Sequence, residues 1–236
     1  MASRKHEFAE SDKVRVLLWC GRHCGLCGRA VGVGIEVAHL DRQRCDLDNA
    51  IPLCFDCHAA IGHYNCQHPR GRKYSIPELK ARRDQIYEQH TRHLVPPVMY
   101  EVHEKGWKFP HIGFHISNLG DTYPVRARVQ VTLAQGSRLS SFDSGHYSGK
   151  SSWNLNPRFG VNGHFDDPKF VSDGQPLRVR IDVTLIDIYD FEHRLLPVGY
   201  VHRLGKDDDW YLEPSEEELG IPGPQQDVAR VSGAHT

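Results

Sequence analysis

Long apolar runs are absent from this 236-residue chain. No stretch approaches the roughly 18 apolar residues of a membrane-spanning helix. The polar start MASRKHEFAESDK also lacks the apolar run of about 7 to 15 residues that a signal peptide contains. With 39% hydrophobic and 25% charged residues the composition is typical of a soluble globular chain. We therefore expect a cytoplasmic protein without a membrane segment.

Cysteine is absent beyond residue 66, although the chain contains 7 cysteines. This uneven distribution indicates two differently built halves, and a length of this kind predicts roughly one to two domains. A short, polar half cannot rely on an apolar core alone, and small domains commonly recruit disulfides or metals. Because the cytoplasm is reducing, we interpret the cysteines as metal ligands before disulfides.

An excess of one charge is also absent, since the formal net charge is -1. Residues 1–95 nevertheless carry 15 Lys and Arg against 11 Asp and Glu, whereas residues 96–236 carry 14 against 19. The basic half is the cysteine-rich half, as expected of a surface that meets phosphate, and a solvated surface explains this small excess equally well. The candidates for phosphate contact are Arg42, Arg44, Arg70, Arg72 and Lys73.

Two predicted helices flank the cysteine-rich segment. Ser11 precedes apolar residues at helical spacing over 14–18, which predicts a short helix that begins at a Ser N-cap and ends near Gly21. Residues 75–78 read Ser-Ile-Pro-Glu, a capping box with proline in the first turn. A second helix is therefore expected from this box to about His93.

The pair Pro96-Pro97 predicts a stiff linker, beyond which the apolar period changes from helical to alternating. Residues 124–133 and 177–185 alternate apolar and polar side chains, as strands with one buried face do. Shorter candidate strands, separated by turn residues, lie at 98–104, 111–117, 151–155, 159–165, 195–203 and 209–212. We interpret 96–212 as an antiparallel β-sandwich with a recognition or regulatory role, and 213–236 as a flexible tail.

Two C-x-x-C pairs, Cys24 with Cys27 and Cys54 with Cys57, are the most specific metal signal in the sequence. Four thiolates at this spacing suit a structural, tetrahedral Zn²⁺. Redox use of either pair is disfavoured because neither lies in a βαβ pattern. Three cysteines are left over and interpreted as free, Cys20, Cys45 and Cys66. The spacing alone leaves Cys20 as an alternative to Cys24.

Between and beyond these pairs stand Glu36-Val-Ala-His39-Leu, then Asp48-Asn49-Ala-Ile-Pro-Leu, and then Cys54-Phe-Asp-Cys57-His58. This order of motifs resembles the zinc-knuckle branch of the HNH endonuclease family. The resemblance implies a ββα-metal fold, in which a β-hairpin and a helix surround one divalent cation. It does not extend to the β-rich half. The expected class is thus α+β, with an HNH module and flanking helices over residues 1–95.

The resemblance also assigns catalytic roles to three residues. His39 is the general base that activates water, which suits a side chain that titrates near neutral pH. Asn49 holds the His39 imidazole through a hydrogen bond. His58 binds a catalytic Mg²⁺ or Mn²⁺, which acts as a Lewis acid toward the phosphate and the leaving 3′ oxygen. The implied activity is hydrolysis of phosphodiester bonds in duplex DNA.

The sequence departs from the family at Ala38, where an Asp that also binds the metal often precedes the catalytic histidine. The second ligand is then Glu36, one pleat away on the same strand face, or Asp41 or His63, or water alone. An alternative is loss of catalysis, which leaves a non-catalytic zinc module that binds nucleic acid or protein. His58 has a second interpretation as a spare zinc ligand.

The β-rich half is expected to recognise the target, a partner protein, a second copy of the chain or an activating ligand. A role in restriction or phage defence is a guess from the combination of a nuclease with a further domain, since a sandwich does not imply a function.

Overall fold

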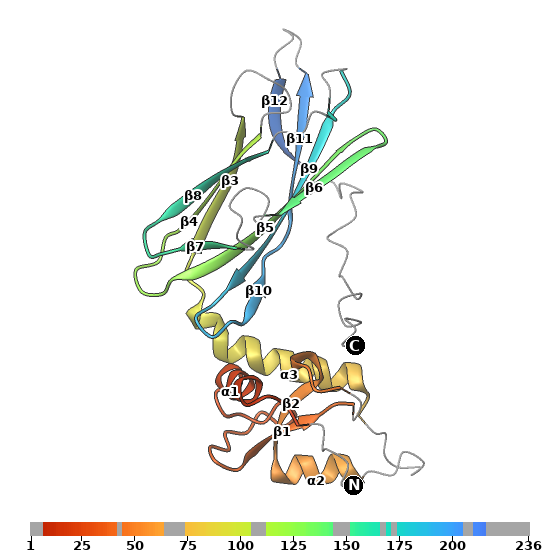
Figure 1. The fold of residues 1–236 in the computed structure, drawn as a ribbon, viewed down its shortest axis with the longest axis vertical. Coiled ribbons are helices and arrows are strands. Elements are labelled where there is room, and N and C mark those ends of the chain that lie inside the picture. Colours follow the sequence, from red (N-terminus) through yellow and green to blue (C-terminus); the bar gives the residue numbers. More distant parts are fainter. Residues whose placement is uncertain are drawn as a thin grey trace, which may run out of the picture. The chain divides into compact units, whose positions relative to one another are not determined.

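The computed structural model describes residues 7–41, 44–63, 74–104, 112–143, 152–165, 169–170, 174–204 and 210–215. Over these ranges the fold is mixed, with three α-helices in the first hundred residues and strands in most of the remainder, consistent with the α+β class (Figure 1). The chain divides into two compact units, residues 1–95 with Asp187–Phe191, and 96–186 with 192–236. Within the described ranges no helix is both long and apolar enough to cross a membrane.

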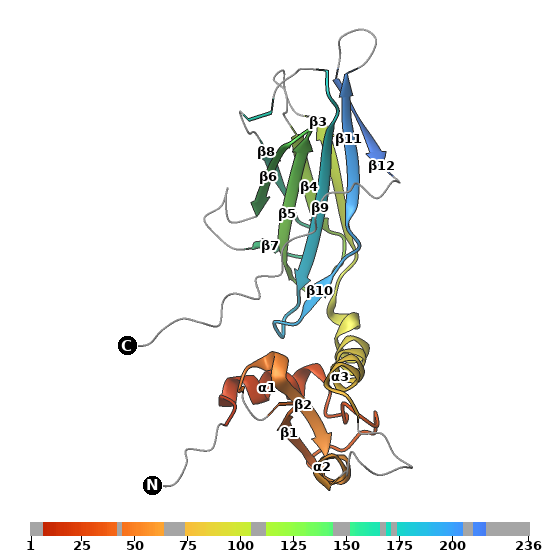
Figure 2. The same cartoon turned by 90° about the vertical axis from the view of Figure 1, so that its right-hand side faces the viewer.

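The first unit is built on a β-hairpin followed by a helix (Figure 2). Its elements in chain order are α1 (Glu10–Trp19), β1 (Ile35–His39), the 3₁₀ turn η1 (Leu47–Asn49), β2 (Ala50–Cys54), α2 (Phe55–His63), α3 (Ile76–Thr91) and the 3₁₀ turn η2 (Arg92–Leu94). Strands β1 and β2 pair antiparallel, from Ile35 opposite Cys54 to His39 opposite Ala50. Helix α2 starts directly after β2, so the second cysteine pair lies at the junction of strand and helix.

The predicted Ser11 N-cap of the first helix is wrong. Helix α1 begins at Glu10 after Ala9, whose carbonyl accepts hydrogen bonds from the amides of Asp12 and Lys13, so Ser11 lies inside the first turn. The predicted end near Gly21 is confirmed, since the helix ends at Trp19 and Gly21 has a φ of 52°.

The predicted Ser75 N-cap of the third helix is confirmed. Ser75 Oγ accepts a hydrogen bond from the Glu78 amide at 3.3 Å, and Pro77 lies in the first turn. The helix ends at Thr91, two residues before the predicted end, and the chain continues as the 3₁₀ turn η2.

The hairpin is covered on both faces. Because strand side chains alternate, Glu36 and Ala38 share one face with Ile51 and Leu53, while His39 lies on the other face with Ala50. The first face belongs to a buried cluster of Cys24, Ala38, Ile51, Leu53, Cys54 and Leu79. The second belongs to a buried cluster of Phe8, Val16, Trp19, Cys20, Ala50 and Tyr87.

The second unit consists of two antiparallel sheets. One contains β3 (Val98–Glu104), β4 (Ile112–Asn118) and β8 (Gly160–Phe165), in the order β3-β4-β8. The other has the order β12-β11-β9-β5-β6, with β7 paired to β5 and β10 to β9. Its strands are β5 (Val125–Gln135), β6 (Arg138–Asp143), β7 (Trp153–Leu155), β9 (Leu177–Ile186), β10 (Glu192–Arg194), β11 (Val198–Leu204) and β12 (Trp210–Ser215).

The alternating pattern is confirmed in β5 and β9, the central strands of the larger sheet, whose apolar positions are buried. The rings of Phe114 on β4 and Trp153 on β7 have centroids 6.2 Å apart, so the two sheets contact each other. Strands β6 and β10 were not predicted, because their sequences RLSSFD and EHR lack an apolar alternation. Strand β12 extends to Ser215, into the predicted tail, and 216–236 lie outside the described residues.

Candidate metal centre and active site

The four predicted zinc ligands lie together. The Sγ atoms of Cys24, Cys27, Cys54 and Cys57 are all within 4.8 Å of one another. A tetrahedral Zn²⁺ with Zn–S bonds of about 2.3 Å would place these atoms roughly 3.8 Å apart. The donor set therefore fits a metal such as zinc. Cys20 is not an alternative to Cys24, because it is buried in the cluster on the other face of the hairpin.

The first cysteine pair sits on a turn that two glycines make possible. Gly28 has a φ of 72°, and its amide donates to the Cys24 carbonyl at 2.9 Å, which folds the turn back on itself. The Gly25 amide donates to the Pro52 carbonyl at 2.7 Å and thereby ties this turn to β2. A Cβ at position 25 would lie 3.1 Å from that same carbonyl oxygen. The close approach of the two cysteine pairs therefore depends on glycine.

Local hydrogen bonds favour a thiolate at Cys54. Burial opposes the charged form, but the Cys57 amide, the thiol of Cys57, Arg29 and Cys24 more than offset it and lower the pKa of Cys54 to about 7. Arg29 Nη2 lies 3.7 Å from this sulfur and 2.7 Å from Asp56 Oδ2. Burial, followed by interaction with neighbouring thiols, raises the pKa of Cys57. Coordination by a metal ion deprotonates thiols. A bound cation would therefore favour the thiolate form of Cys57 as well as that of Cys54.

His58 directly follows the zinc-ligand candidate Cys57. Its side chain contacts Glu36, which was one of the predicted replacements for the Asp that the family often has at the position of Ala38. Its Nδ1 lies 2.7 Å from Glu36 Oε2, and the two side chains are 48% and 50% exposed. Ala38 is 5% exposed within the apolar cluster and offers no ligand. The side chain of His63 lies outside the described residues. The 2.7 Å distance between His58 and Glu36 is that of a direct hydrogen bond or ion pair between the two exposed side chains. Carboxylates and imidazoles are both ligand types that divalent cations use in proteins.

His39, the predicted base, ends β1 on the opposite hairpin face from Glu36. Its ring stacks on Phe8 with centroids 4.1 Å apart and an interplanar angle of 19°. Its Nε2 lies 3.5 Å from Cys45 Sγ. Among the described residues, the Cys quartet forms a ligand cluster of three or more members, and His39 does not belong to it.

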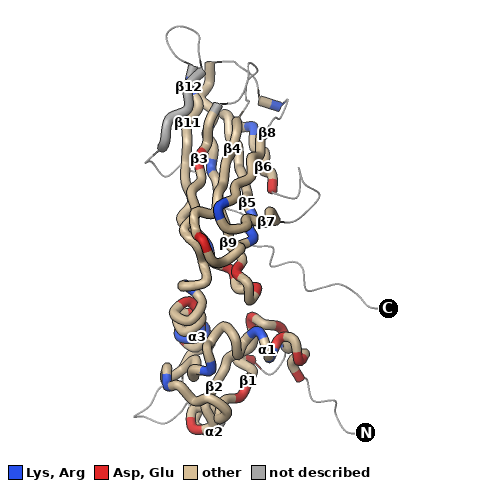
Figure 3. The backbone as a smooth tube through the Cα atoms, turned by 90° about the vertical axis from the view of Figure 1, so that its left-hand side faces the viewer, with Lys and Arg blue, Asp and Glu red and all other residues tan. Residues whose placement is uncertain are grey.

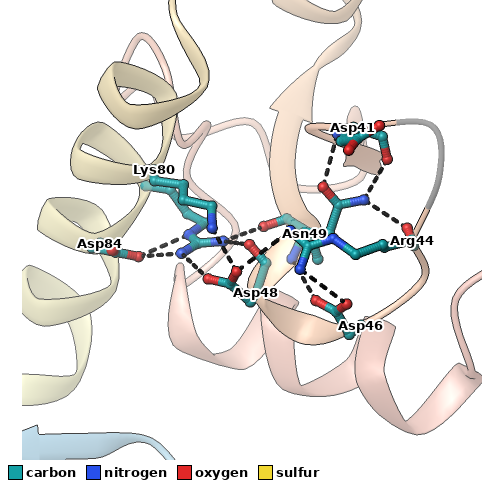
Figure 4. A network of polar contacts seen from close by, with 9 residues as sticks. Asp41, Arg44, Asp46, Asp48, Asn49, Lys80 and Asp84 are labelled. Carbon is teal, nitrogen blue, oxygen red and sulfur yellow. Dashed lines mark hydrogen bonds and ion pairs between the residues drawn. The ribbon is translucent and has the colours of Figure 1, made fainter. Parts of the chain in front are cut away.

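The predicted hydrogen bond from Asn49 to the His39 imidazole is wrong. The fully buried Asn49 accepts a hydrogen bond from the Asp41 amide at 2.8 Å and donates through Nδ2 to the carbonyls of Asp41 and Arg44 (Figure 4). The hydrogen-bond partners of the Asn49 side chain are therefore backbone groups that follow β1, and the His39 imidazole is not among them. Asn49 holds the loop that connects His39 to Cys45.

A buried arginine of α3 holds η1 and the start of β2, and sequence analysis did not identify it. Arg83 is 5% exposed, and its Nη1 donates to the carbonyls of Asp48 at 2.7 Å and Ala50 at 3.0 Å. Lys80 and Asp84 complete the ion-pair network (Figure 4). The available signal was spacing, because Arg83 lies four residues from both Leu79 and Tyr87, which are buried on the same helix face.

Of the five phosphate-contact candidates, Arg44 is the one that lies within the described residues. Arg44 lies 3.7 Å from both Asp46 and Asp48, and the other candidates, Arg42, Arg70, Arg72 and Lys73, lie outside the described residues. Figure 3 shows acidic and basic positions interspersed along the first unit. Over the described residues of this unit, the charge pattern does not by itself mark a nucleic-acid surface.

A cavity of about 550 Å³ adjoins the cysteine cluster. It is lined by Cys27, Cys57, apolar side chains that include Leu26, Ile61 and Ile86, and the polar side chains Tyr74, Arg82 and Gln85. The lining includes none of His39, Asn49 and His58. The three residues predicted to be catalytic therefore lie outside the lining of this cavity.

Comparison with known proteins assigns no family. No family model matches the chain, and no curated protein matches it. Among solved structures, the chain is similar to one described as "X-ray structure of Northeast Structural Genomics Consortium target SoR45". That match has 10% sequence identity and a TM-score of 0.29 and covers 44% of this chain and 83% of that chain. So low a TM-score supports neither a fold nor a function.

Proposed function

We propose that residues 1–95 form a metal-dependent endonuclease module of the HNH type that hydrolyses phosphodiester bonds in DNA. The observation that carries the proposal is the 2.7 Å contact between His58 and Glu36, next to the cysteine cluster, in a hairpin followed directly by a helix. This contact supplies a carboxylate and an imidazole where Ala38 leaves the family's usual ligand missing.

The four cysteines would hold a structural Zn²⁺. The first pair lies on the turn at 24–27 and the second at the junction of β2 and α2, so one ion would join two segments that are distant in sequence. His58 follows Cys57 directly on α2. The zinc centre would therefore fix the backbone that presents His58 to Glu36.

Glu36 and His58 would hold the second cation, Mg²⁺ or Mn²⁺. When bound, this ion supplies Lewis-acid stabilisation of charge on the phosphate and on the leaving 3′ oxygen. A carboxylate suits either ion, whereas imidazole is a better ligand for Mn²⁺ than for Mg²⁺. The ligand pair therefore favours the binding of Mn²⁺ over that of Mg²⁺.

His39 would act as the general base. Its imidazole would accept a proton from water while the water oxygen bonds to phosphorus and the bond to the 3′ oxygen breaks. The leaving 3′ oxygen would take a proton from a solvent water, which gives a 3′-hydroxyl and a 5′-phosphate. Stacking on Phe8 limits rotation of the ring. His39 and Glu36 lie on opposite faces of the hairpin. The phosphodiester would therefore have to lie across the end of β1 to contact both side chains.

The second unit would be a β-sandwich formed by its two antiparallel sheets. It would recognise the DNA target, a partner protein or a second copy of the chain.

A non-catalytic zinc module that binds nucleic acid or protein is the second candidate. The observation in its favour is Ala38, which is buried among apolar residues where the family often has an acidic ligand.

Cleavage by the purified, zinc-loaded chain tests the proposal. Supercoiled plasmid, linear duplex, single-stranded DNA and RNA are incubated with Mg²⁺, with Mn²⁺ or with a chelator of divalent ions. Wild type is expected to cut duplex DNA with Mn²⁺ or Mg²⁺, and His39→Ala to lose about 10² to 10⁴-fold in rate. His93→Ala, at an exposed histidine of the same unit, is the matched control and should retain activity.

Two results would contradict the proposal. Undiminished cleavage by His39→Ala would remove His39 from the chemistry. One bound zinc with no cleavage of any substrate under either ion would favour the non-catalytic module.

A further inference from the structure

A thiol contacts the proposed base of the reaction. Cys45 Sγ lies 3.5 Å from His39 Nε2, and Phe8 covers one face of the same ring. Cys45 is not a member of the zinc-ligand cluster. A thiol is a weak donor and acceptor of hydrogen bonds, so it suits either ring tautomer.

Asn49 fixes the backbone on both sides of this thiol. On one side its Nδ2 donates to the Arg44 carbonyl at 2.6 Å. On the other side its backbone amide donates to Asp46, to the Oδ1 and carbonyl oxygens, each at 3.0 Å. The residues before and after Cys45 are thus both held by a fully buried residue. Asn49 reaches His39 indirectly, through the placement of Cys45.

We propose that Cys45 is a positioning residue for His39, an inference that rests on the proposed nuclease function. The sulfur engages Nε2, and the other ring nitrogen, Nδ1, is the one left to accept the proton from water. For His39 to act as the base in this arrangement, Nε2–H has to donate to the Cys45 sulfur so that Nδ1 carries the lone pair. Cys45 performs the orienting task that the family resemblance gave to Asn49.

A packing role for Cys45 gives the opposite pattern of mutant behaviour. Cys45 is partly buried against the cluster of Phe8 and Ala50, so it also fills space there. Cys45→Ser keeps a hydrogen-bonding group and loses apolar packing, whereas Cys45→Val keeps apolar volume and loses the hydrogen bond. Positioning predicts that serine preserves function and valine does not, and packing predicts the reverse.

The experiment measures kcat and KM for DNA cleavage in both variants, together with nitrogen NMR of the His39 ring. Residues that orient a reacting or metal-binding side chain typically contribute about 10 to 100-fold to activity. Cys45→Val is expected to lose kcat in that range with KM for DNA unchanged, while Cys45→Ser stays close to wild type. The ring-nitrogen signals of His39 should shift in the valine variant and remain near wild type in the serine variant.

Equal kcat in wild type and Cys45→Val would overturn the inference, as would retention by valine combined with loss by serine. Zinc content and the melting temperature establish that each variant is folded, and Cys45→Ala replaces the valine variant if that one does not fold. The NMR arm does not depend on cleavage. If wild type cuts no substrate, the proposed nuclease function fails, and unchanged ring signals in the valine variant would separately refute the contact between Cys45 and His39.

Discussion

Replacing Asn49 by alanine is expected to release the loop that follows β1. The side chain is fully buried and makes three hydrogen bonds, one from the Asp41 amide and one each to the carbonyls of Asp41 and Arg44. Buried hydrogen bonds contribute roughly 0.5 to 1.5 kcal/mol each to stability. The variant should therefore lose about 3 kcal/mol, equivalent to roughly a hundredfold in the unfolding equilibrium of the first unit.

Two measurements report this loss at different scales. Urea unfolding of the zinc-loaded chain gives the free energy, and native-state amide exchange locates the change. Exchange at the Asp41 amide should accelerate, because it loses its acceptor. The Leu40 amide donates to the Asn49 backbone carbonyl, a bond that the substitution leaves in place, so its protection should change only as much as the unit's stability does.

Asn154→Ala, at an exposed position, is the matched control and is expected to change stability by less than about 0.5 kcal/mol. A loss below that same value in Asn49→Ala, with Asp41 exchange unchanged, would show that the three hydrogen bonds do not hold the loop.

Three further perturbations have defined outcomes. One zinc per chain is expected, and its removal by a chelator or by Cys54→Ser should unfold the first unit while circular dichroism retains the strand signal of the cysteine-free second unit. Glu36→Gln should weaken Mn²⁺ binding, measured by electron paramagnetic resonance, by about tenfold or more, whereas Glu88→Gln at an exposed position should not. Arg83→Met should cost about 3 kcal/mol in urea unfolding, because two carbonyls lose a charged donor, and the exposed Arg82→Met should cost almost nothing.

The features predicted well from sequence depend on short-range patterns. The two C-x-x-C pairs predicted the cluster of four cysteines, Ser75 and Glu78 predicted the start of a helix, and strict alternation predicted strands β5 and β9. Each of these signals lies within one element or repeats at a fixed spacing. Strands β6 and β10 carry no such signal, since pairing with a neighbouring strand defines them.

The site was less accessible to prediction because its contacts are tertiary. The order of motifs predicted roles for His39, Asn49 and His58. The hydrogen-bond partners of Asn49 are backbone groups of a loop, and a sequence does not identify such partners. The burial of Arg83 also depends on how α3 packs on the hairpin. Glu36 was one of several options for a second ligand, and its 2.7 Å contact with His58 now favours it.

The measurement that tests the central claim most directly is cleavage of an end-labelled DNA duplex by wild type and His39→Ala at equal zinc content in the presence of Mn²⁺. Wild type should release fragments that end in a 3′-hydroxyl, and the variant should be slower by about two orders of magnitude or more while its zinc content and melting temperature stay unchanged. Equal rates in the two proteins, or an intact duplex in both, would contradict the assignment of residues 1–95 as a nuclease that uses His39.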